Sequence, residues 1–494
     1  MLIKRKLKKL ARNIKSQPDF AFIDQLVKKY SEAEVHLVGG LVRDYIIGRQ
    51  EMVDYDFVIR NISAQKLREF LEPLGWVDLV GRDFGVYKFV PRDSQLTEAI
   101  DIALPRTDFA TGGGGYHDFA IQTDPKLPLA DDLSRRDFTI NAMAVNMRDG
   151  RLVDPYGGLA DIKRGLIRTV GEPKDRFRED YSRILRGIRF AAQLGLKIES
   201  GTWQSICRLA KYVTATKLTS AGKVLIVPKE TLAEEFIKSL SADPLVTFDL
   251  YDASSIMHYV FPEIEDMKGV EQPLEFHAEG DVFFHTRLCL QLTPTDVSTE
   301  LRLALLLHDI GKPSTQKTPE RDRVDRIRFD EHPEEGAKLA HQICRRLRLA
   351  NKLTERVVWL VRNHMMFVMG QVEDMRTTTI KKYFIDDVKL GDDLLELYRI
   401  DTEASDSSQQ RKFLARQREV VEHIARMREA FAEAEVKTFR HIITGQDIMQ
   451  EFNLEPGPGV GKYLMRVDDF IFKYVVKNKK EPSRDEVIKF LKNK

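Results

Sequence analysis

The hydrophobic pattern of this chain changes near residue 176, and this change constrains the fold more than any other feature of the sequence. Before it, helical segments such as AQKLREFLE are mixed with strand-like runs, namely VDYDFVI, GVYKFV, AIDIAL and FTINAMAVNM. After it, strand patterns become scarce and apolar residues recur at helical spacing, as in RILRGIRFAAQL and LRLALLLHDI. We therefore predict an α+β fold in which a small mixed sheet near the N-terminus is followed by an all-helical part.

Composition bounds the kind of protein that this can be. The 494 residues are enough for several domains, and the formal net charge of +2 means that affinity for a polyanion must come from local patches. The three cysteines, Cys207, Cys289 and Cys344, form no C-x-x-C pair, which argues against a disulfide framework and a cysteine zinc site. No apolar run approaches the roughly 20 residues that cross a bilayer. These features predict a cytoplasmic protein without a membrane partner.

The first 18 residues contain no acid and many lysines. Their apolar residues Ile3, Leu7, Leu10 and Ile14 fall at helical spacing. A transit peptide would also be basic, but such peptides are rich in arginine and serine rather than lysine. We therefore favour a basic amphipathic helix that packs on the first domain.

Two aspartates follow a glycine turn in the stretch HLVGGLVRDYIIGRQEMVDYDFVIR. The pattern predicts a strand over Val35–Val38, a helix over Leu41–Ile47 and a second strand over Val53–Ile59. Side chains alternate along a strand, so Asp54 and Asp56 are expected to project to the same side. Two neighbouring carboxylates repel each other unless a cation lies between them, and hard oxygen ligands suit Mg²⁺. A lone D-x-D is more often a pair of surface acids, so the rest of the chain must decide.

Several residues could receive an anion near these aspartates. Gly39 and Gly40 lack β-carbons, which would let a bulky anion approach the backbone at a helix N-terminus. The adjacent Arg135 and Arg136 precede a strand-like run, and arginine binds phosphate oxygens with two parallel hydrogen bonds.

A third arginine-rich segment is RFREDYSRILRGIRFAAQLG. Arg183, Arg186 and Arg189 recur every three residues, which aligns them along one flank of a predicted helix. Asp180 lies one turn before Arg183 and would add an acceptor to the same face. Such a pair can recognise the edge of a base as well as a phosphate. Taken alone, three arginines on a helix more often form a solvated face.

Five ordered motifs resemble those of the class II tRNA nucleotidyltransferases, the superfamily of CCA-adding enzymes and bacterial poly(A) polymerases. They are G-G-x-V-R-D, D-x-D, R-R-D-F-T-I-N-A, D-P-Y-G-G and E-D-x-x-R-x-x-R-x-x-R-F, within residues 35 to about 195. The resemblance implies a nucleotidyltransferase head followed by helical neck, body and tail. The corresponding expected boundaries are 1–34 for the N-terminal helix, 35–162 for the head, 163–265 for the neck, 266–430 for a further helical domain and 431–494 for an RNA-binding tail.

The resemblance implies roles for individual residues. Asp54 and Asp56 would hold catalytic Mg²⁺ ions, and Asp101 would be a third carboxylate near them. Asp180 and Arg183 would form a protein template that selects CTP or ATP by hydrogen bonds to the base. The residues expected at the nucleotide are Gly39, Gly40, Arg43, Arg135, Arg136, Asp180, Arg183, Arg186 and Arg189.

The implied activity is the addition of CMP and AMP to the 3′ end of tRNA, with CTP and ATP as substrates and no nucleic-acid template. The expected partner is the 3′ end and acceptor arm of tRNA. Addition of CC alone, of A alone or of poly(A) stays open. The long glycine-rich segment PRTDFATGGGGYHDF favours CCA or CC addition, although it has Arg106-Thr-Asp108 where the family has Arg-x-Glu.

A second group of potential metal ligands lies in the helical part. The group comprises His285, His308, Asp309, His332, His364 and Asp401. A single buried histidine is more often a core residue, but a His-Asp doublet with partners on successive helices suits a divalent transition metal. The group resembles the HD phosphohydrolase domain, with His332 and His364 as the extra ligands of binuclear members. This resemblance implies metal-dependent hydrolysis of a phosphoester such as a 2′,3′-cyclic phosphate. A purely structural role, or a hydrolase whose head only binds RNA, is the alternative.

Overall fold

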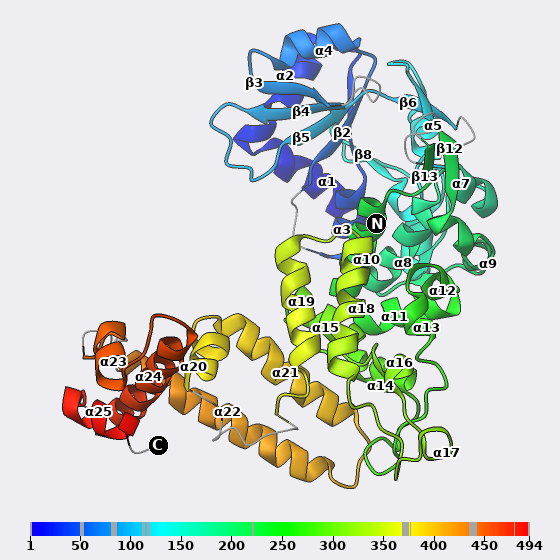
Figure 1. The fold of residues 1–494 in the computed structure, drawn as a ribbon. Coiled ribbons are helices and arrows are strands. Elements are labelled where there is room, and N and C mark those ends of the chain that lie inside the picture. The colour runs from blue at the N-terminus through cyan, green and yellow to red at the C-terminus, as the bar shows by residue number, and fades with distance from the viewer. Residues whose placement is uncertain are drawn as a thin grey trace. The chain divides into compact units, whose positions relative to one another are not determined.

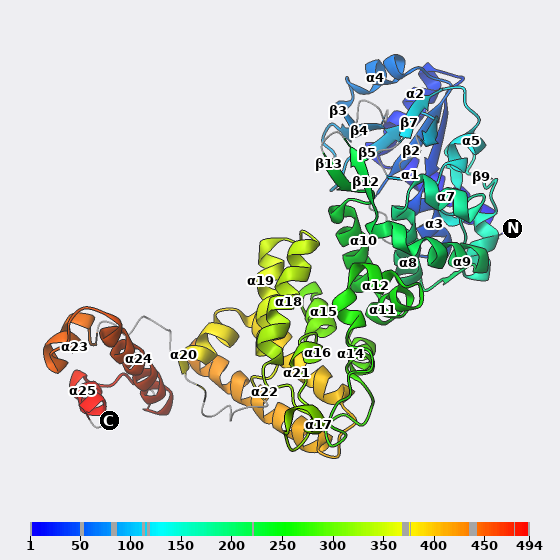
Figure 2. The same cartoon turned by 45° about the vertical axis from the view of Figure 1, so that its right-hand side comes forward.

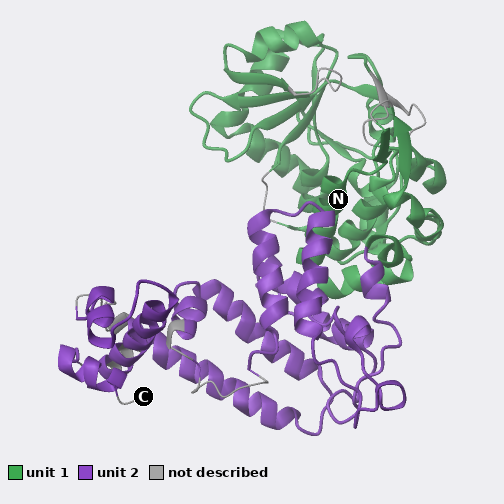
Figure 3. Ribbon diagram, viewed as in Figure 1, with its two compact units in different colours: residues 1–260 green, residues 261–494 purple. Residues whose placement is uncertain are grey.

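The structure is a computed structural model that describes ten stretches of the chain. They are residues 2–49, 54–80, 86–110, 114–115, 119–219, 222–367, 375, 377–433, 442–478 and 480–492. The chain forms two compact units, Met1–Val260 and Phe261–Lys494 (Figure 3). The five-part division expected from the sequence stays a prediction, because these units do not separate its parts.

The first unit is built on a mixed sheet of seven strands in the order β3-β4-β5-β2-β1-β8-β9 (Figure 1). The strands are β1 Glu34–Val38, β2 Asp56–Arg60, β3 Gly75–Val80, β4 Val86–Pro91, β5 Ile100–Ala103, β8 Ala144–Asn146 and β9 Leu152–Val153. Strand β2 pairs with β1 in the antiparallel and with β5 in the parallel direction. The predicted small mixed sheet is therefore present.

Alternation along the strands gives the sheet two different faces. Leu37, Phe57 and Ile102 belong to the main core, which also includes residues of the helices α1, α2 and α4. These helices span Leu2–Lys15, Ala21–Lys29 and Ala64–Leu71. Val38 and Val58 point to the opposite face and pack on α5 (Leu129–Ser134). Residues with the parity of Val58, including Asp56, therefore project away from the main core.

The N-terminal helix packs as the sequence predicted. Leu7, Leu10 and Ile14 are each at most 1% exposed within the main core, and the lysines lie on the other side of α1. Helix α3 (Gly40–Ile47) follows β1 directly and agrees closely with the predicted helix.

Two predicted strands differ from the structure. The strand predicted from Val53 begins at Asp56; Asp54 and Tyr55 precede it, and Val53 lies outside the described residues. The run FTINAMAVNM is a strand only at β8, because its first part forms a 3-10 turn, η2 (Thr139–Asn141). The cause is Asp137, whose Oδ1 atom accepts hydrogen bonds from the Phe138 N–H and the Asn141 side chain and so closes the turn.

Helices fill the remainder of the first unit. They are α6 Gly158–Arg164, α7 Pro173–Glu179, α8 Ser182–Leu194, α9 Ser200–Leu209, α10 Lys229–Ala242, α11 Pro244–Ala253 and α12 Ile256–Val260. Three two-stranded sheets accompany them, formed by β6 (Arg106–Ala110) with β7 (Phe119–Thr123), β10 (Leu166–Ile167) with β11 (Lys197–Ile198), and β12 (Thr216–Thr219) with β13 (Gly222–Leu225). Most of the glycine-rich segment between β6 and β7, which the sequence analysis linked to CCA or CC addition, lies outside the described residues.

The second unit consists of helices joined by loops, and its described residues contain no strand beyond one isolated β-bridge between Lys317 and Arg328 (Figure 2). Its helices are α13 Pro262–Glu265, α14 Val282–Gln291, α15 Thr299–Leu307, α16 Lys312–Thr315, α17 Pro319–Asp322, α18 His332–Arg346, α19 Asn351–Asn363, α20 Thr377–Ile380, α21 Val388–Ala404, α22 Gln410–Glu433, α23 Gly445–Phe452, α24 Pro458–Asn478 and α25 Arg484–Lys492, with a π-helical turn at Lys381–Ile385. Among the helices in the part of the chain that is described, none is long and apolar enough to span a bilayer.

Candidate nucleotide site and candidate metal centre

A row of charged side chains crosses the face of the seven-stranded sheet that lies opposite the main core. Lys88 on β4 is in register with Asp101 on β5, Asp101 with Asp56 on β2, and Asp56 with Val38 on β1. Because residues in register lie side by side on one face, the two carboxylates are neighbours. Lys88 Nζ lies 2.6 Å from Asp101 Oδ1. Lys88 thus places a positive charge next to Asp101, the carboxylate that lies farther from β1.

The Asp56 carboxylate lies in an environment that disfavours its charge. Burial raises its pKa to about 6, Arg136 opposes this increase, and the negative charges of Asp101 and Asp54 add to it. A hydrogen bond with Asp54 likewise raises the pKa of Glu98. Such a concentration of carboxylates is the donor set that a divalent cation with hard oxygen ligands needs, so Asp54, Asp56 and Asp101 fit the metal that the sequence predicted. In the described residues their oxygens do not all lie within 4.8 Å of one another.

The glycine turn brings backbone up to this carboxylate. Gly39 has φ +78°, and a β-carbon there would lie 2.8 Å from Asp56 Oδ2 and 3.4 Å from Arg136 Nη1. Gly40 then begins α3. Only glycine combines this backbone conformation with this close approach.

Three predicted nucleotide residues are held by acceptors of the chain. Arg43 binds both Asp44 oxygens, at 2.9 and 2.8 Å, and donates to Asn141 Oδ1 at 2.7 Å. Arg135 donates to Asp132 Oδ1 at 3.0 and 2.9 Å. Arg136 donates to the carbonyl oxygen of Asn141 at 3.4 Å, and burial lowers its pKa.

Asp180 does not lie on the arginine helix, contrary to the expectation from spacing. It follows α7 in an extended conformation, with φ −154° and ψ 106°, and its Oδ1 atom accepts the Ser182 N–H at 2.9 Å. Arg183 lies in the first turn of α8. Its guanidinium donates to Glu179 Oε2 at 2.6 Å and to the carbonyl oxygen of Arg135 at 3.1 Å. Both side chains are buried, so their orientations are fixed before any ligand binds.

The two remaining arginines of α8 form ion pairs with residues outside the helix. Arg186 binds Asp137 Oδ2 at 2.7 Å and lies 3.6 Å from Glu235 Oε1. Arg189 binds Glu235 Oε2 at 2.5 Å, and its guanidinium lies 4.2 Å from the Phe190 ring centroid. Burial would raise the pKa of Asp137, but Arg186 and the hydrogen bond from Asn141 hold it well below its ordinary value. Their predicted contact with phosphates stays a prediction.

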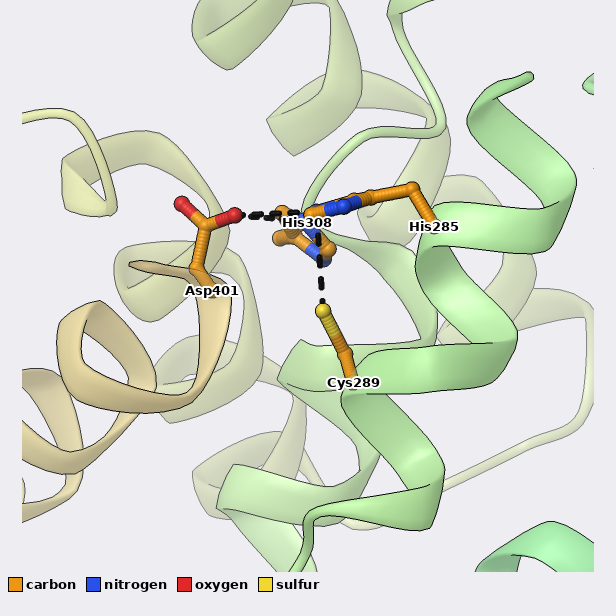
Figure 4. A group of neighbouring side chains, drawn as sticks. All are labelled: His285, Cys289, His308 and Asp401. Carbon is orange, nitrogen blue, oxygen red and sulfur yellow. Dashed lines mark hydrogen bonds and ion pairs between the residues drawn. The ribbon is translucent and has the colours of Figure 1, made fainter. Parts of the chain in front are cut away.

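The second unit brings the predicted His and Asp ligands together. Four donor atoms lie within 4.8 Å of one another, from His285, Cys289, His308 and Asp401. Figure 4 shows these side chains converging from α14, the end of α15 and α21. His285 Nε2 is 2.9 Å from Asp401 Oδ1, and His308 Nε2 is 3.7 Å from the same oxygen. All but Asp401 are fully buried.

Asp309 turns its two oxygens toward two different ligand groups. Oδ2 lies 3.3 Å from His308 Nε2 and 3.9 Å from His285 Nε2. Oδ1 lies 3.5 Å from His332 Nε2 and 3.8 Å from His364 Nε2. Burial would raise the pKa of Asp309, but His308 and a nearby lysine hold it well below its ordinary value, so the carboxylate is charged. It can therefore bridge two cations.

Hydrogen bonds fix the tautomers of three of these histidines. In each, Nδ1 lies at hydrogen-bond distance from the carbonyl oxygen three residues earlier; the pairs are His308 with Leu305 (2.9 Å), His332 with Phe329 (2.6 Å) and His364 with Val361 (2.7 Å). A carbonyl only accepts, so Nδ1 carries the proton and Nε2 presents a lone pair to the centre.

These lone pairs fit metal ions. His308 Nε2 is buried and has no hydrogen-bond partner among the described residues. His332 Nε2 and His364 Nε2 lie 3.0 Å apart, and burial lowers the pKa values of these residues to about 3 and about 4, so a proton does not separate them at neutral pH. Two facing lone pairs repel each other unless a cation binds both. The residues present therefore fit a divalent metal at each group.

We call His285, Cys289, His308 and Asp401 the first ligand group, and Asp309, His332 and His364 the second. A cavity of about 700 Å³ opens beside the second ligand group. Asp309, His332 and Asp401 line it, together with the basic side chains Lys312, Arg326, Arg328 and Arg362 and the apolar side chains Phe276, Met365, Met366, Tyr398 and Phe413. Lys312 Nζ lies 2.7 Å from Asp309 Oδ2. The cavity combines ligands for cations with groups that bind an anion and an apolar ring.

Three residues at these sites were missed in the sequence. Lys88 could have been found from strand alternation, once β4 and β5 were known to pair. Glu279 accepts hydrogen bonds at 2.7 Å from His285 Nδ1 and at 2.8 Å from His277 Nδ1, and no sequence pattern indicates it. Cys289 follows His285 by four residues on a helix, a spacing that places both side chains on one face.

Comparisons with known proteins identify the families of both parts of the chain. Residues 35–168 match the poly A polymerase head domain family, and residues 282–409 match the HD domain family. The multifunctional CCA protein of Nitrosococcus oceani is 33% identical over 71% of this chain and 78% of its own length. The protein of the same name from Acinetobacter baylyi is 33% identical over 67% and 74%.

Solved structures share the fold. The Bacillus stearothermophilus CCA-adding enzyme in complex with CTP has a TM-score of 0.62 at 20% identity, covering 97% of this chain and 98% of that chain. The Thermotoga maritima CCA-adding enzyme complexed with tRNA has a TM-score of 0.53 at 17% identity, covering 100% and 94%. At these identities the similarity concerns the fold.

Proposed function

Because this chain belongs to the class II tRNA nucleotidyltransferases, together with the multifunctional CCA proteins, we propose that it adds CMP and AMP to the 3′ end of tRNA. Its substrates would be CTP, ATP and a tRNA with an incomplete 3′ end, and no nucleic-acid template would be used. The proposed cellular location is the cytoplasm.

One observation carries this proposal. Asp56 and Asp101 lie side by side on one face of the sheet. Asp56 also lies next to Gly39, the residue before α3, and Arg136 lies close to the same glycine. A divalent cation would stabilise the charged form of Asp56, whose pKa is raised to about 6 by burial. The backbone at Gly39 comes so close to this carboxylate that no side chain fits between them.

The proposed roles follow from this geometry. Asp54, Asp56 and Asp101 would hold Mg²⁺. When bound, a pair of such ions activates the RNA 3′-hydroxyl and stabilises the charge of the departing pyrophosphate. The residues that would bind and orient the triphosphate are Gly39, Gly40, Arg43, Arg135, Arg136, Arg186 and Arg189. No nucleophile of the protein is needed, because the RNA hydroxyl attacks the α-phosphate directly.

Asp180 and Arg183 would select the base. Arg183 is held by three acceptors and Asp180 by one backbone N–H, so a guanidinium and a carboxylate are presented in fixed orientations. Hydrogen bonds from a rigid pair discriminate between base edges because a mismatched base leaves buried polar groups unpaired.

The test is to incubate the full-length protein with tRNA lacking its last three nucleotides and to sequence the 3′ ends. Addition of C, C and A with CTP and ATP together is the expected result. Addition of CC alone, of A alone to tRNA ending in CC, or of a long A tract would identify the alternative enzymes of this superfamily. Asp54→Ala is expected to abolish incorporation while the protein stays folded. Incorporation by this variant at the wild-type rate would remove the metal assignment.

A second proposed activity is metal-dependent hydrolysis of a phosphoester in the HD domain. It is supported by two groups of metal ligands bridged by Asp309 and by a cavity with basic side chains beside them. When bound, a divalent metal supplies a hydroxide nucleophile and Lewis-acid stabilisation. Lys312 and the three cavity arginines would bind the phosphate oxygens.

Two variants separate these activities. His308→Ala is expected to stop hydrolysis of 2′,3′-cyclic AMP but to leave CCA addition unchanged, and Asp54→Ala is expected to do the reverse. A protein that hydrolyses the cyclic nucleotide and never extends tRNA would instead be a hydrolase with an RNA-binding head. Absence of hydrolysis in a metal-loaded wild type would favour a structural role for the HD domain.

A further inference from the structure

We propose that Cys289 is a metal ligand, and that it makes one position of the HD centre a closed site for a transition metal that accepts sulfur. The inference rests on the proposed metal centre and assigns one more donor to it. Cys289 Sγ lies 3.5 Å from His285 Nε2, and it lies within 4.8 Å of the donor atoms of His308 and Asp401 (Figure 4).

Two of these separations match the edges of a tetrahedral site. Ligand atoms about 2.0–2.3 Å from a zinc ion stand about 3.3–3.8 Å apart along the edges of a tetrahedron. Cys289 Sγ is 3.5 Å from His285 Nε2 and His308 Nε2 is 3.7 Å from Asp401 Oδ1, whereas His285 Nε2 is 2.9 Å from Asp401 Oδ1 and would move apart on binding an ion. Buried cysteines usually pack as small apolar side chains. Cys289 instead faces two imidazoles and a carboxylate, and one of those imidazoles, that of His308, has a buried nitrogen without a hydrogen-bond partner among the described residues.

The cavity distinguishes the two positions of the centre. Asp309 and His332 line it, and so does Asp401, whereas His285, Cys289 and His308 do not. Three of the four donors of the first group therefore do not line the cavity, whereas two of the three donors of the second group (Asp309 and His332, but not His364) do. A four-ligand site without an open position is typical of structural metals, and an open position is typical of catalytic ones. Cys289 would complete the closed position with His285, His308 and Asp401. Asp309 would then serve the second group with His332 and His364, and that position would stay open to substrate.

The sulfur donor also selects the metal. Magnesium binds oxygen ligands and is poorly held by thiolate, whereas zinc, iron and cobalt accept it. Binding replaces the thiol proton with the metal and releases that proton to solvent. The closed position should therefore hold zinc or a similar ion in the presence of excess Mg²⁺.

The test uses full-length metal-free protein titrated with Co²⁺, whose thiolate complexes absorb strongly in the near ultraviolet. Wild type is expected to show this charge-transfer band, and Cys289→Ala is expected to lose it. The matched control is the double variant Cys207→Ala/Cys344→Ala, which keeps Cys289 as its single cysteine and should keep the band. Loss of a residue that only hydrogen-bonds to a metal ligand lowers metal affinity by about 10–100-fold, and loss of a direct ligand should lower it further. We therefore expect the Zn²⁺ affinity of Cys289→Ala to fall by about 100-fold or more.

X-ray absorption of the zinc-loaded wild type gives a second measurement that needs no variant. One sulfur atom at about 2.3 Å from zinc is expected. A shell of nitrogen and oxygen alone, or a cobalt spectrum that is unchanged in Cys289→Ala, would overturn the assignment of Cys289 while leaving the centre intact. Wild-type protein that binds neither Co²⁺ nor Zn²⁺ would overturn the metal centre itself.

Discussion

A β-carbon on Gly39 would lie 2.8 Å from the Oδ2 atom of Asp56, so the glycine turn and the carboxylate cannot both keep their positions once residue 39 has a side chain. We expect Gly39→Ala to lower kcat/KM for CTP incorporation by about 100-fold, because a displacement of about 1 Å is enough to misalign reacting groups. Steady-state incorporation into tRNA measures this effect.

The control for this variant is Gly165→Ala. Gly165 has φ +69°, close to the +78° of Gly39, but a β-carbon there would meet nothing within 4 Å. Gly165→Ala should lose about 1–2 kcal/mol of stability, because Gly165 has the left-handed conformation (φ +69°, ψ +38°). Gly39→Ala should lose about 1–3 kcal/mol, because Gly39 (φ +78°, ψ −145°) lies in a region that is almost exclusive to glycine. Equal loss of incorporation in both would mean that backbone strain, and not the contact with Asp56, limits the enzyme.

Asp56 is expected to destabilise the metal-free protein at neutral pH. Burial raises its pKa from 3.8 to about 6, so the folded protein favours the protonated form, and stability is lost as the pH rises from about 4 through about 6. In Asp56→Asn this loss should be absent. We expect the variant to gain on the order of 1–3 kcal/mol in urea unfolding at pH 7.5 without divalent metal, and to be inactive. A variant less stable than wild type would show that Asp56 stabilises the head through contacts instead.

The same pKa predicts how metal binding depends on pH. A proton and a divalent cation compete for the Asp56 carboxylate, so the apparent affinity of the head for Mg²⁺ should be about tenfold lower at pH 5 than at pH 7. Calorimetric titration of His308→Ala/His364→Ala with Mg²⁺ isolates this site, because the double variant loses one ligand from each group of the HD centre. An affinity that does not change between these pH values would exclude Asp56 as a ligand.

The ion pair between Asp137 and Arg186 should stabilise the junction of the η2 turn and α8. Asp137 is buried and its pKa is held below the ordinary value of 3.8, so its contribution is present at neutral pH and is lost as the pH falls below about 4. We expect Asp137→Asn to lose about 1–3 kcal/mol at pH 7, since Arg186 is partly exposed and keeps Glu235 as a neighbour. A double-mutant cycle with Arg186→Gln measures the pair; a coupling energy near zero would contradict it.

Removal of His308 should empty the first position of the HD centre. Elemental analysis of purified His308→Ala is expected to show less transition metal than wild type, because its Nε2 atom has no hydrogen-bond partner among the described residues and faces the other donors of this group. The control is His341→Ala, which removes an exposed histidine of α18. Identical metal content in all three proteins would place the metal elsewhere.

The sequence allowed much of the local structure around Asp56 to be predicted, but not its neighbours. The strand before Gly39 and the helix after it follow from alternation, helical spacing and the glycine turn. The contact with Asp101 depends on parallel pairing of β2 with β5, which is a long-range choice that no local pattern encodes. Lys88 enters the site through the antiparallel pairing of β4 with β5, which local patterns do not encode either.

Side-chain hydrogen bonds explain the local errors. FTINAMAVNM has the composition of a strand, but Asp137 satisfies the backbone of the turn that precedes β8. Asp180 has helical spacing to Arg183, yet it lies in an extended link and caps the next helix. In the HD domain, Cys289 was missed because the cysteines were considered only as possible pairs. Its spacing of four residues from His285 predicts that both side chains lie on one face of a helix.

Glu235 on α10 forms ion pairs with both Arg186 and Arg189, so α8, the helix that carries these two arginines, is linked by charge to α10. A polyphosphate that draws either guanidinium toward itself must compete with that carboxylate. Binding of the substrate would then weaken an ion pair between α8 and α10, so the strength of the contact between these two helices would depend on whether a nucleotide is bound.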